Sequence, residues 1–487
     1  MADLKEENSY RNILKRISAF GGVQVFNIII NLIRGKFVAV FLGAEGMGIS
    51  SLLSSATNTI QQFAGLGLNL ALVKEVAANK EDSNKLSQVV AVTVRLILFT
   101  SLLGAAVCGF AAPLWGRWTF GDYSYTGSFI LLSVAVALSI GGSGYLALLQ
   151  GLGSVKRITK ASLVGGLTGL FCGVPIYWLF GINGIVPAMI ILSLAVFLFY
   201  FISFKSKTST EIQKSSFEWS KHKSIVKKLI SLGLLLMIGS LVGTLVNYLI
   251  NLFVRFIGSV EDVGLFQAAN SLTNQYVGII FSALAMDYFP RLSAVANKNS
   301  DLADVVNRQI EIVMLITTPL VILLIISTPL VIRLLLTEEF LCITSLMRWM
   351  GLGMLIQALA FPIGYIYIAK EDRKAYIWME VAMSNCVWII SSILFYFYFG
   401  LLGLGISLVA RGVLDLIINC LLCRFRYGFI FNSRNIRIIF LSVILGVAGF
   451  FASMCDDSSG MIISLLIFIL SVTYSFLTLR KTLKSTR

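Results

Sequence analysis

The sequence predicts an all-α protein whose helices cross a membrane many times. Of its 487 residues, 57% are hydrophobic and 13% are charged, and the mean hydropathy is +0.87. Soluble domains carry roughly a quarter charged residues. Apolar runs of about 20 residues, the length that spans a bilayer as a helix, recur along the whole chain.

Fourteen such runs are expected to form transmembrane helices, and several are long enough to tilt or to extend past the bilayer. In chain order they are 17–42, 46–72, 86–112, 126–152, 158–179, 184–204, 226–257, 262–289, 305–335, 340–369, 374–399, 402–423, 436–454 and 460–480. The polar start of the chain precedes the first run without a small-residue cleavage site, so we expect no cleaved signal peptide.

The distribution of basic residues supports this count. If the N-terminus is cytoplasmic, 30 of the 39 Lys and Arg residues lie in connections on the cytoplasmic side. The connections on the other side contain Arg117 alone. This asymmetry follows the positive-inside rule and predicts that both termini are cytoplasmic. The net charge of +15 is therefore a feature of topology and of attraction to anionic lipids, and no nucleic-acid partner is expected.

An internal repeat divides the chain into two lobes. The segment FLGAEGMGISSLLSSATN (41–58) is similar to FIGSVEDVGLFQAANSLTN (256–274), with Gly43 aligned on Gly258. Six helices separate the copies, so both begin on the same membrane side and the repeat is parallel. We expect two six-helix lobes around a central cavity, with two further helices. The expected parts are an N-terminal lobe (1–204), a cytoplasmic basic linker (205–225), a C-terminal lobe (226–430), and two helices with a cytoplasmic tail (431–487).

Residues typical of enzymes and metal sites are scarce. The chain has one histidine, His222, and seven scattered cysteines, of which Cys420 and Cys423 form a CxxC inside an apolar run. We expect that pair to pack rather than to bind metal. The longest outward connection, PLWGRWTFGDYSY (113–125), has no room for a catalytic domain. No catalytic residue, metal or cofactor is therefore expected.

Polar side chains inside the spans form stripes at helical spacing. Asn27, Asn31 and Arg34 share one face of the first span, and its repeat partner, the seventh span, ends a similar stripe in Arg255. An isolated charge at the bilayer centre costs about 2.5–3.5 kcal/mol, so such residues face protein, water or a ligand. The candidate cavity residues are Asn27, Asn31, Arg34, Asn58, Asn247, Asn251, Arg255, Asn270, Asn274, Arg348 and Arg411.

These stripes predict a water-filled cationic cavity for an anionic, hydroxyl-rich cargo. Arginine binds phosphate through several parallel hydrogen bonds, and amides bind sugar hydroxyls. The alternative is that the same groups join helices by hydrogen bonds. Arg411 and Asp415, four residues apart, can also neutralise each other. Asp415 is in addition the acid that we consider for ion coupling, since it is the one placed deep in a span.

The twelve-plus-two arrangement and the segment RGKFVAVFLGAEGMGISSLLSS (34–55) resemble the polysaccharide-exporter branch of the multidrug/oligosaccharidyl-lipid/polysaccharide (MOP) superfamily, and in particular the Wzx-type O-antigen translocases. The resemblance implies a bacterial inner-membrane protein that flips an undecaprenyl-diphosphate-linked oligosaccharide by alternating access of two lobes. Arg34 matches the first-helix arginine of related lipid flippases. The implied partners are this polyprenyl diphosphate glycan, the lipid bilayer and other membrane proteins of polysaccharide assembly.

Two alternatives share this topology, namely a multidrug or toxin exporter and a peptidoglycan-precursor flippase. Drug exporters often depend on acids within the membrane, whereas the deep charges of this chain are mostly basic. A membrane glycan polymerase or ligase is disfavoured, because such enzymes need catalytic groups in sizeable outward loops.

Overall fold

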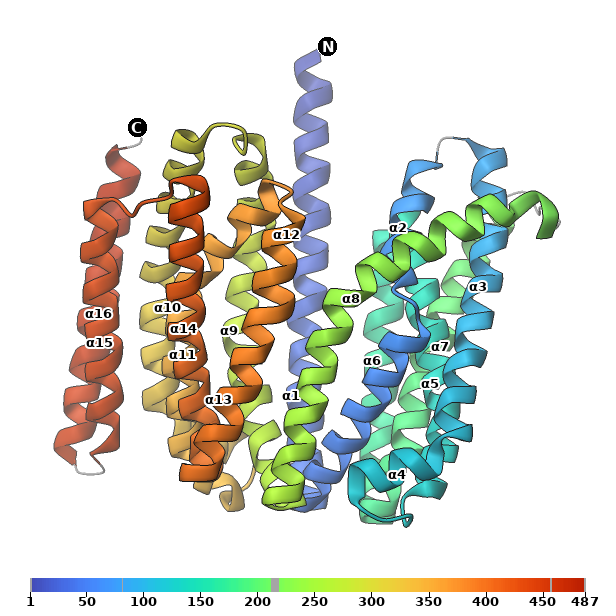
Figure 1. Ribbon diagram of the computed structural model, residues 1–487, viewed down its shortest axis with the longest axis horizontal. Helices are drawn as coiled ribbons and strands as arrows, with labels where there is room; N and C mark the ends of the chain where they lie inside the picture. The colour runs from blue at the N-terminus through green and yellow to red at the C-terminus, as the bar shows by residue number, and fades with distance from the viewer. Residues whose placement is uncertain (1, 81, 212–218, 456–457, 486–487) are drawn as a thin grey trace. The chain divides into compact units, whose positions relative to one another are not determined.

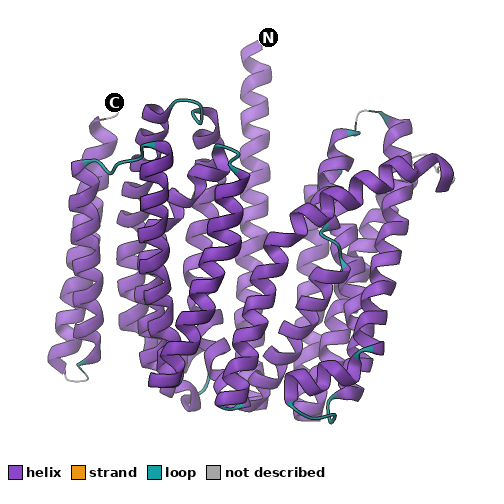
Figure 2. Ribbon diagram, in the orientation of Figure 1, coloured by secondary structure: helices purple, strands orange, loops and turns teal. Residues whose placement is uncertain are grey.

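The computed structural model describes residues 2–80, 82–211, 219–455 and 458–485. These ranges are helical almost throughout and contain no strand (Figure 2). The α-helices (Figure 1) are α1 (Ala2–Ala64), α2 (Leu68–Ala78), α3 (Ser83–Phe110), α4 (Ala112–Phe120), α5 (Thr126–Gly151), α6 (Val155–Phe180), α7 (Ile185–Glu211), α8 (Trp219–Ile257), α9 (Val260–Ala294), α10 (Asn299–Leu335), α11 (Thr344–Ala369), α12 (Arg373–Tyr376), α13 (Ser384–Phe399), α14 (Leu401–Tyr427), α15 (Ser433–Met454) and α16 (Ser458–Ser485). Two 3-10 helices, η1 (Gly181–Gly184) and η2 (Glu338–Ile343), and one π-helix, η3 (Ile377–Met383), complete the order.

The structure confirms an all-helical, multi-pass membrane protein. Each expected span coincides with helical backbone, and within the described residues 11 helical segments are long and apolar enough to cross a membrane. One of them, Val155–Ser206, contains two expected spans, in α6 and α7. The count of fourteen helices and the cytoplasmic position of both termini stay predictions.

The chain forms two compact units, Met1–Arg255 and Phe256–Arg487. The division lies at the end of α8, whereas the sequence predicts lobes that meet in the linker 205–225 and assigns α8 to the second lobe. The structure thus records α8 packed within the first unit. The predicted lobe limits stay a prediction.

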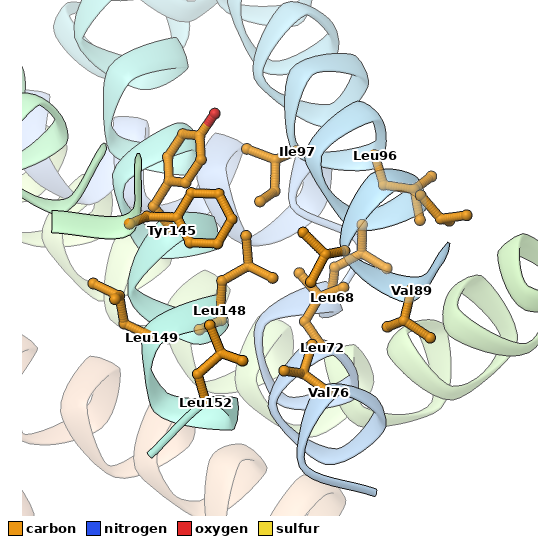
Figure 3. Close-up of a cluster of buried hydrophobic side chains, with 14 of the residues drawn as sticks. Leu68, Leu72, Val76, Val89, Leu96, Ile97, Tyr145, Leu148, Leu149 and Leu152 are labelled. Atoms are coloured by element: carbon orange, nitrogen blue, oxygen red, sulfur yellow. The ribbon is translucent and has the colours of Figure 1, made fainter. Parts of the chain in front are cut away.

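Within the first unit, α5 packs against α3 and α7, and α6 packs against α1 and α7. A large cluster of buried apolar side chains joins α3, α5, α6 and α7 to α2 (Figure 3). Leu72 of α2 and Leu148 of α5 are fully buried there, and Leu229 of α8 belongs to the same cluster. The cluster fixes the positions of α2 and α8 against the rest of the unit.

Two breaks shape the beginning of the first unit. Gly43 interrupts α1 with φ of 63°, a conformation that glycine adopts without steric cost. Its repeat equivalent, Gly258, lies in the turn between α8 and α9. The second break separates α1 from α2, where Leu66 and Gly67 both have positive φ (50° and 60°). The expected span 46–72 therefore consists of two helical pieces.

Helix α8 is fixed to the first unit at both of its ends. Near its start, the Nζ of Lys228 lies 2.8 Å from a carboxylate oxygen of Glu75 in α2. Near its end, the hydroxyl of Tyr248 hydrogen-bonds the hydroxyl of Thr119 in α4 at 2.7 Å. Between them, Gly233 passes so close to the break before α2 that a Cβ there would lie 2.5 Å from the carbonyl oxygen of Leu66.

In the second unit, α10 packs against α11, α15 and α16, and α14 packs against α11 and α13. Helix α15 is joined to α10 by polar contacts as well as apolar ones. The amide of Asn435 is fully buried and donates to the main-chain oxygen of Asn307 at 2.6 Å. Helices α11 and α14 pack against each other and line the pocket described below.

Replacement of Gly233 by alanine should destabilise the first unit, because the new Cβ cannot fit against the backbone of the α1–α2 break. The expected cost is about 1–3 kcal/mol, the usual range for overpacking. Gly243→Ala on the same helix is the matched control, since nothing lies within 4 Å of a Cβ there and alanine favours the helix by about 1 kcal/mol. Thermal unfolding in detergent should give a lower melting temperature for Gly233→Ala alone. Equal melting temperatures for the two variants would contradict the close approach of α8.

Candidate functional site

The predicted stripe on α1 contains an amide that bonds another helix and an arginine that has no hydrogen bond or ion pair to the described residues. The side-chain amide of Asn27 donates to the hydroxyl of Ser162 in α6 at 3.0 Å, which joins two helices of the first unit. Asn31 is exposed. Arg34 is partly buried and forms no hydrogen bond or ion pair with any residue that the structure describes. Of the three, Arg34 is therefore the one best placed to receive an anion.

Arg255, the predicted counterpart of Arg34, is engaged by the protein itself. Its guanidinium donates to the main-chain oxygen of Phe120, at the end of α4. A cation at this position is favourable, because the carboxyl end of a helix carries partial negative charge. Hydrogen bonds from Ser124, and the positive charge of Arg255, lower the pKa of Asp122 in the adjoining turn, although burial acts in the opposite direction. Arg255 thus organises the connection after α4 in this structure.

The remaining predicted amides in α8 and α9 bond within their own helices. The side-chain amide of Asn251, fully buried, donates to Asn247 at 3.3 Å. That of Asn274, exposed, donates to Asn270 at 2.7 Å. Each of these two bonds joins residues one turn apart on the same helix. Asn58 of α1 is exposed.

Two of the predicted arginines lie in the second unit. Arg348 is buried on α11, with 9% of its surface exposed. Arg411 lies on α14 at a pocket of about 380 Å³, a size in the range of small-molecule sites. The pocket is lined by α11, η3, α13 and α14, with Phe281 from α9.

Arg411 is held by three groups inside this pocket. Its Nε lies 3.4 Å from the carboxylate of Asp415, one turn further along α14. A terminal nitrogen donates to the hydroxyl of Ser384 at 3.1 Å, and that hydroxyl donates to Asp415 at 2.8 Å. The guanidinium also lies over the ring of Trp388, 4.5 Å from its centre. The two charges therefore compensate each other, as their spacing in the sequence allows.

The π-helix η3 brings a second carboxylate to the pocket. Glu380 lies in its middle and accepts a hydrogen bond of 2.5 Å from the hydroxyl of Tyr367. The side chain of Asn385 donates to the main-chain oxygens of Glu380 and Val381, at 2.8 and 3.0 Å. It thereby satisfies carbonyl groups where the helical register changes. π-Helical turns are rare and occur frequently at functional sites.

An aromatic wall and a buried amide complete the pocket. Phe361 stacks on Phe281 with ring centres 5.2 Å apart, and Tyr365 meets Phe361 edge-on at 5.0 Å. Asn419 is 6% exposed and donates to the main-chain oxygen of Asp415. Its side-chain oxygen has no hydrogen-bond partner in the described part of the chain. A buried acceptor of this kind is costly unless a ligand or water satisfies it.

The structure brings together three residues that the sequence places on one face of a helix, namely Arg411, Asp415 and Asn419. Sequence reasoning missed the contribution of Glu380, Ser384 and the aromatic wall. The position of Glu380 depends on a π-turn, which cannot be read from periodicity. Within the described residues, no group of three or more His, Cys, Asp and Glu side chains is close enough to bind a metal ion.

Comparison with known proteins identifies the family. The profile of the family described as "Polysaccharide biosynthesis protein" matches residues 37–345, well over half of the chain. The chain belongs to this family. The Lipid III flippase of Escherichia coli (strain K12) is 23% identical over 357 residues, which cover 72% of this chain and 84% of that protein.

Solved structures show the same fold. The Lipid II flippase MurJ, in an inward closed conformation, aligns with a TM-score of 0.69 at 16% identity and covers 96% of this chain and 99% of its own. An inward-facing multidrug resistance MATE family transporter of the MOP superfamily aligns with a TM-score of 0.66 at 16% identity, covering 82% and 94%. The fold is thus that of MOP superfamily flippases and transporters. These relatives are not enzymes, as the sequence predicts for this chain.

The contacts of Arg411 predict a measurable coupling with Asp415. Arg411→Met and Asp415→Asn should each lower the melting temperature, because each leaves a partly buried charge without its partner. The double variant should lose less stability than the sum of the two single losses, with a coupling free energy of about 0.5–3 kcal/mol. Lys298→Met and Asp301→Asn form the control cycle, since that ion pair is exposed and should show almost no coupling. Strictly additive losses in both cycles would show that Arg411 does not compensate Asp415.

Proposed function

We propose that the protein flips an undecaprenyl-diphosphate-linked oligosaccharide, the repeat unit of an O-antigen or another surface polysaccharide, across the bacterial inner membrane. Its family is described as a polysaccharide biosynthesis family, a relative is named a lipid flippase, and its fold is that of flippases. The resemblance to Wzx-type translocases favours an oligosaccharide cargo over a peptidoglycan precursor.

Arg34 is the observation that carries this proposal. A cation within a transmembrane helix, with no hydrogen bond or ion pair among the described residues, would be retained at a cost of about 2.5–3.5 kcal/mol unless it served a ligand. A guanidinium suits a diphosphate, because its parallel donors match the phosphate oxygens. We assign the diphosphate to Arg34 and the glycan to the amide stripes, which comprise Asn27, Asn31, Asn58, Asn247, Asn251, Asn270 and Asn274.

In the proposed cycle, the two lobes alternate access to the two sides of the membrane while the prenyl tail stays in lipid. Arg255 would meet the diphosphate only in a state in which its bond to Phe120 is broken. We keep Arg348 as a candidate cavity residue, since it is an arginine buried within a span. Asp415 is the candidate for ion coupling, because a bound cation or proton would compete with Arg411 for its carboxylate.

Complementation tests the cargo and the role of Arg34 together. In a bacterial strain that lacks its own O-antigen flippase and makes the matched glycan, the wild-type protein should restore surface polysaccharide. Arg34→Ala should lose at least 90% of this activity at equal membrane abundance and unchanged melting temperature, and Arg34→Lys should retain part of it. Ile33→Ala, the neighbouring exposed apolar residue, is the control for disturbance of α1.

Each contrary result has a defined meaning. Full activity of Arg34→Ala would remove Arg34 from the binding site but keep the flippase assignment. Failure of the wild type with a matched glycan would contradict the flippase assignment. Resistance to cationic drugs in the same strain would then favour the multidrug exporter.

Ion coupling predicts that an imposed proton or sodium gradient accelerates flipping by the wild-type protein in vesicles. Asp415→Asn should abolish the acceleration while leaving slow flipping without a gradient. Asp301→Asn, an exposed carboxylate outside the pocket, should behave as the wild type. An undiminished response of Asp415→Asn would exclude Asp415 as the coupling group.

A further inference from the structure

The pocket of the second unit has the wrong charge for an acidic cargo. Its described lining includes three charged side chains, Glu380, Arg411 and Asp415. Arg411 and Asp415 compensate each other through their direct contact and through Ser384. Glu380 is not part of that pair, and its recorded hydrogen bond comes from the neutral hydroxyl of Tyr367. The formal charge of the pocket is therefore −1, in contrast to the cationic stripe of α1.

The polar part of the pocket contains several hydrogen-bond acceptors beside donors such as Gln357 and Tyr376. The carboxylates of Glu380 and Asp415 both accept, and the side-chain oxygen of Asn419 is buried without a partner among the described residues. A ligand that offers several O–H or N–H donors can bind these acceptors. Hydrogen bonds to the carboxylates are the stronger ones, because one partner is ionised.

Part of the pocket lining is apolar and aromatic. Phe281, Phe361 and Tyr365 form a continuous cluster of ring contacts in this part. An aromatic face offers a flat apolar surface with a negative centre, which suits the slightly positive C–H face of a pyranose ring. A flat ligand with an apolar face and donors on its rim matches both parts of the lining, and a sugar is such a ligand.

We propose that this pocket is a sugar subsite that accepts a neutral or amino sugar of the lipid-linked glycan and disfavours an acidic one. This inference rests on the proposed function and makes it more specific, since it names the charge class of the sugar. Glu380 provides the discrimination, because a uronic acid carboxylate would face it at close range. Arg411 does not serve as an anion receptor here, since Asp415, Ser384 and Trp388 already engage its guanidinium.

Binding to the full chain in lipid nanodiscs tests the proposal. The probes are farnesyl diphosphate and its conjugates with N-acetylglucosamine, glucosamine and glucuronic acid, each titrated by microscale thermophoresis. We expect the glucosamine conjugate to bind at least as tightly as the N-acetylglucosamine conjugate. The glucuronic acid conjugate should bind about tenfold more weakly than the N-acetylglucosamine conjugate, the usual effect of one unfavourable charge contact.

Glu380→Gln should bring the affinities for the glucuronic acid and N-acetylglucosamine conjugates within about twofold of each other, because it removes the excess charge and keeps the shape of the side chain. Glu338→Gln is the matched control, since it makes the same chemical change on an exposed residue of η2, and it should keep the tenfold difference. Farnesyl diphosphate should bind the wild type and both variants equally. If Glu380→Gln does not fold, Tyr365→Leu should reduce the affinity for the N-acetylglucosamine conjugate to that for farnesyl diphosphate.

The outcomes separate this inference from the function on which it rests. If the wild type binds none of the diphosphate lipids, the proposed function fails and the sugar subsite fails with it. If it binds all four equally, or if Glu380→Gln keeps the tenfold difference, the flippase assignment stands and the sugar subsite is overturned. If Tyr365→Leu leaves sugar affinity unchanged, the aromatic wall does not bind sugar and the subsite is likewise overturned.

Discussion

A charged side chain inside hydrocarbon must meet an opposite charge, a backbone dipole, water or a ligand. Three deep arginines of this protein meet that requirement in different ways. Arg411 is compensated by Asp415 on its own helix. Arg255 donates to a carbonyl oxygen at the end of α4. Arg34 has no hydrogen bond or ion pair within the described residues, and its recorded electrostatic interaction is with Tyr177, so water or a ligand must satisfy its donors. The three arginines therefore have different roles, because their surroundings differ.

The same constraint explains why α8 belongs to the first unit in this structure. Its ends carry Lys228 and Arg255, and both cations find their partners in that unit, on α2 and at the end of α4. The close approach of Gly233 to the α1–α2 break adds a steric fit that larger side chains would prevent. Polar contacts at both ends of α8 and the close approach of Gly233 between them specify the packing of α8 in this state. The repeat in the sequence reports an evolutionary and topological relation, and it carries no information about which conformation is populated.

Much of the fold could be predicted because membrane helices obey simple rules of length and polarity. Apolar runs located the long helices, since an unsatisfied backbone group in lipid is too costly for any other structure, whereas α4 lies in an expected connection. The Arg411–Asp415 pair was also predictable, because four residues bring side chains together on one helix. Ser384 was not, because 31 positions separate it from Asp415 and only the packing of α13 on α14 brings them within 2.8 Å. The orientation of Glu380 depends on a π-turn, which shifts the periodicity on which sequence reasoning relies.

The two candidate sites have opposite electrostatic character, and this combination suits the amphipathic substrate that we propose. A lipid-linked oligosaccharide has a diphosphate that is always anionic and sugars whose charge varies with the glycan. A single cationic cavity would bind the diphosphate of every such lipid. It would favour acidic glycans and would not otherwise distinguish one sugar from another. A separate pocket with an excess carboxylate selects by sugar charge, because discrimination between similar ligands requires an element that repels the wrong one. Arg34 would then contribute affinity for the class of lipid, and Glu380 would contribute specificity within it.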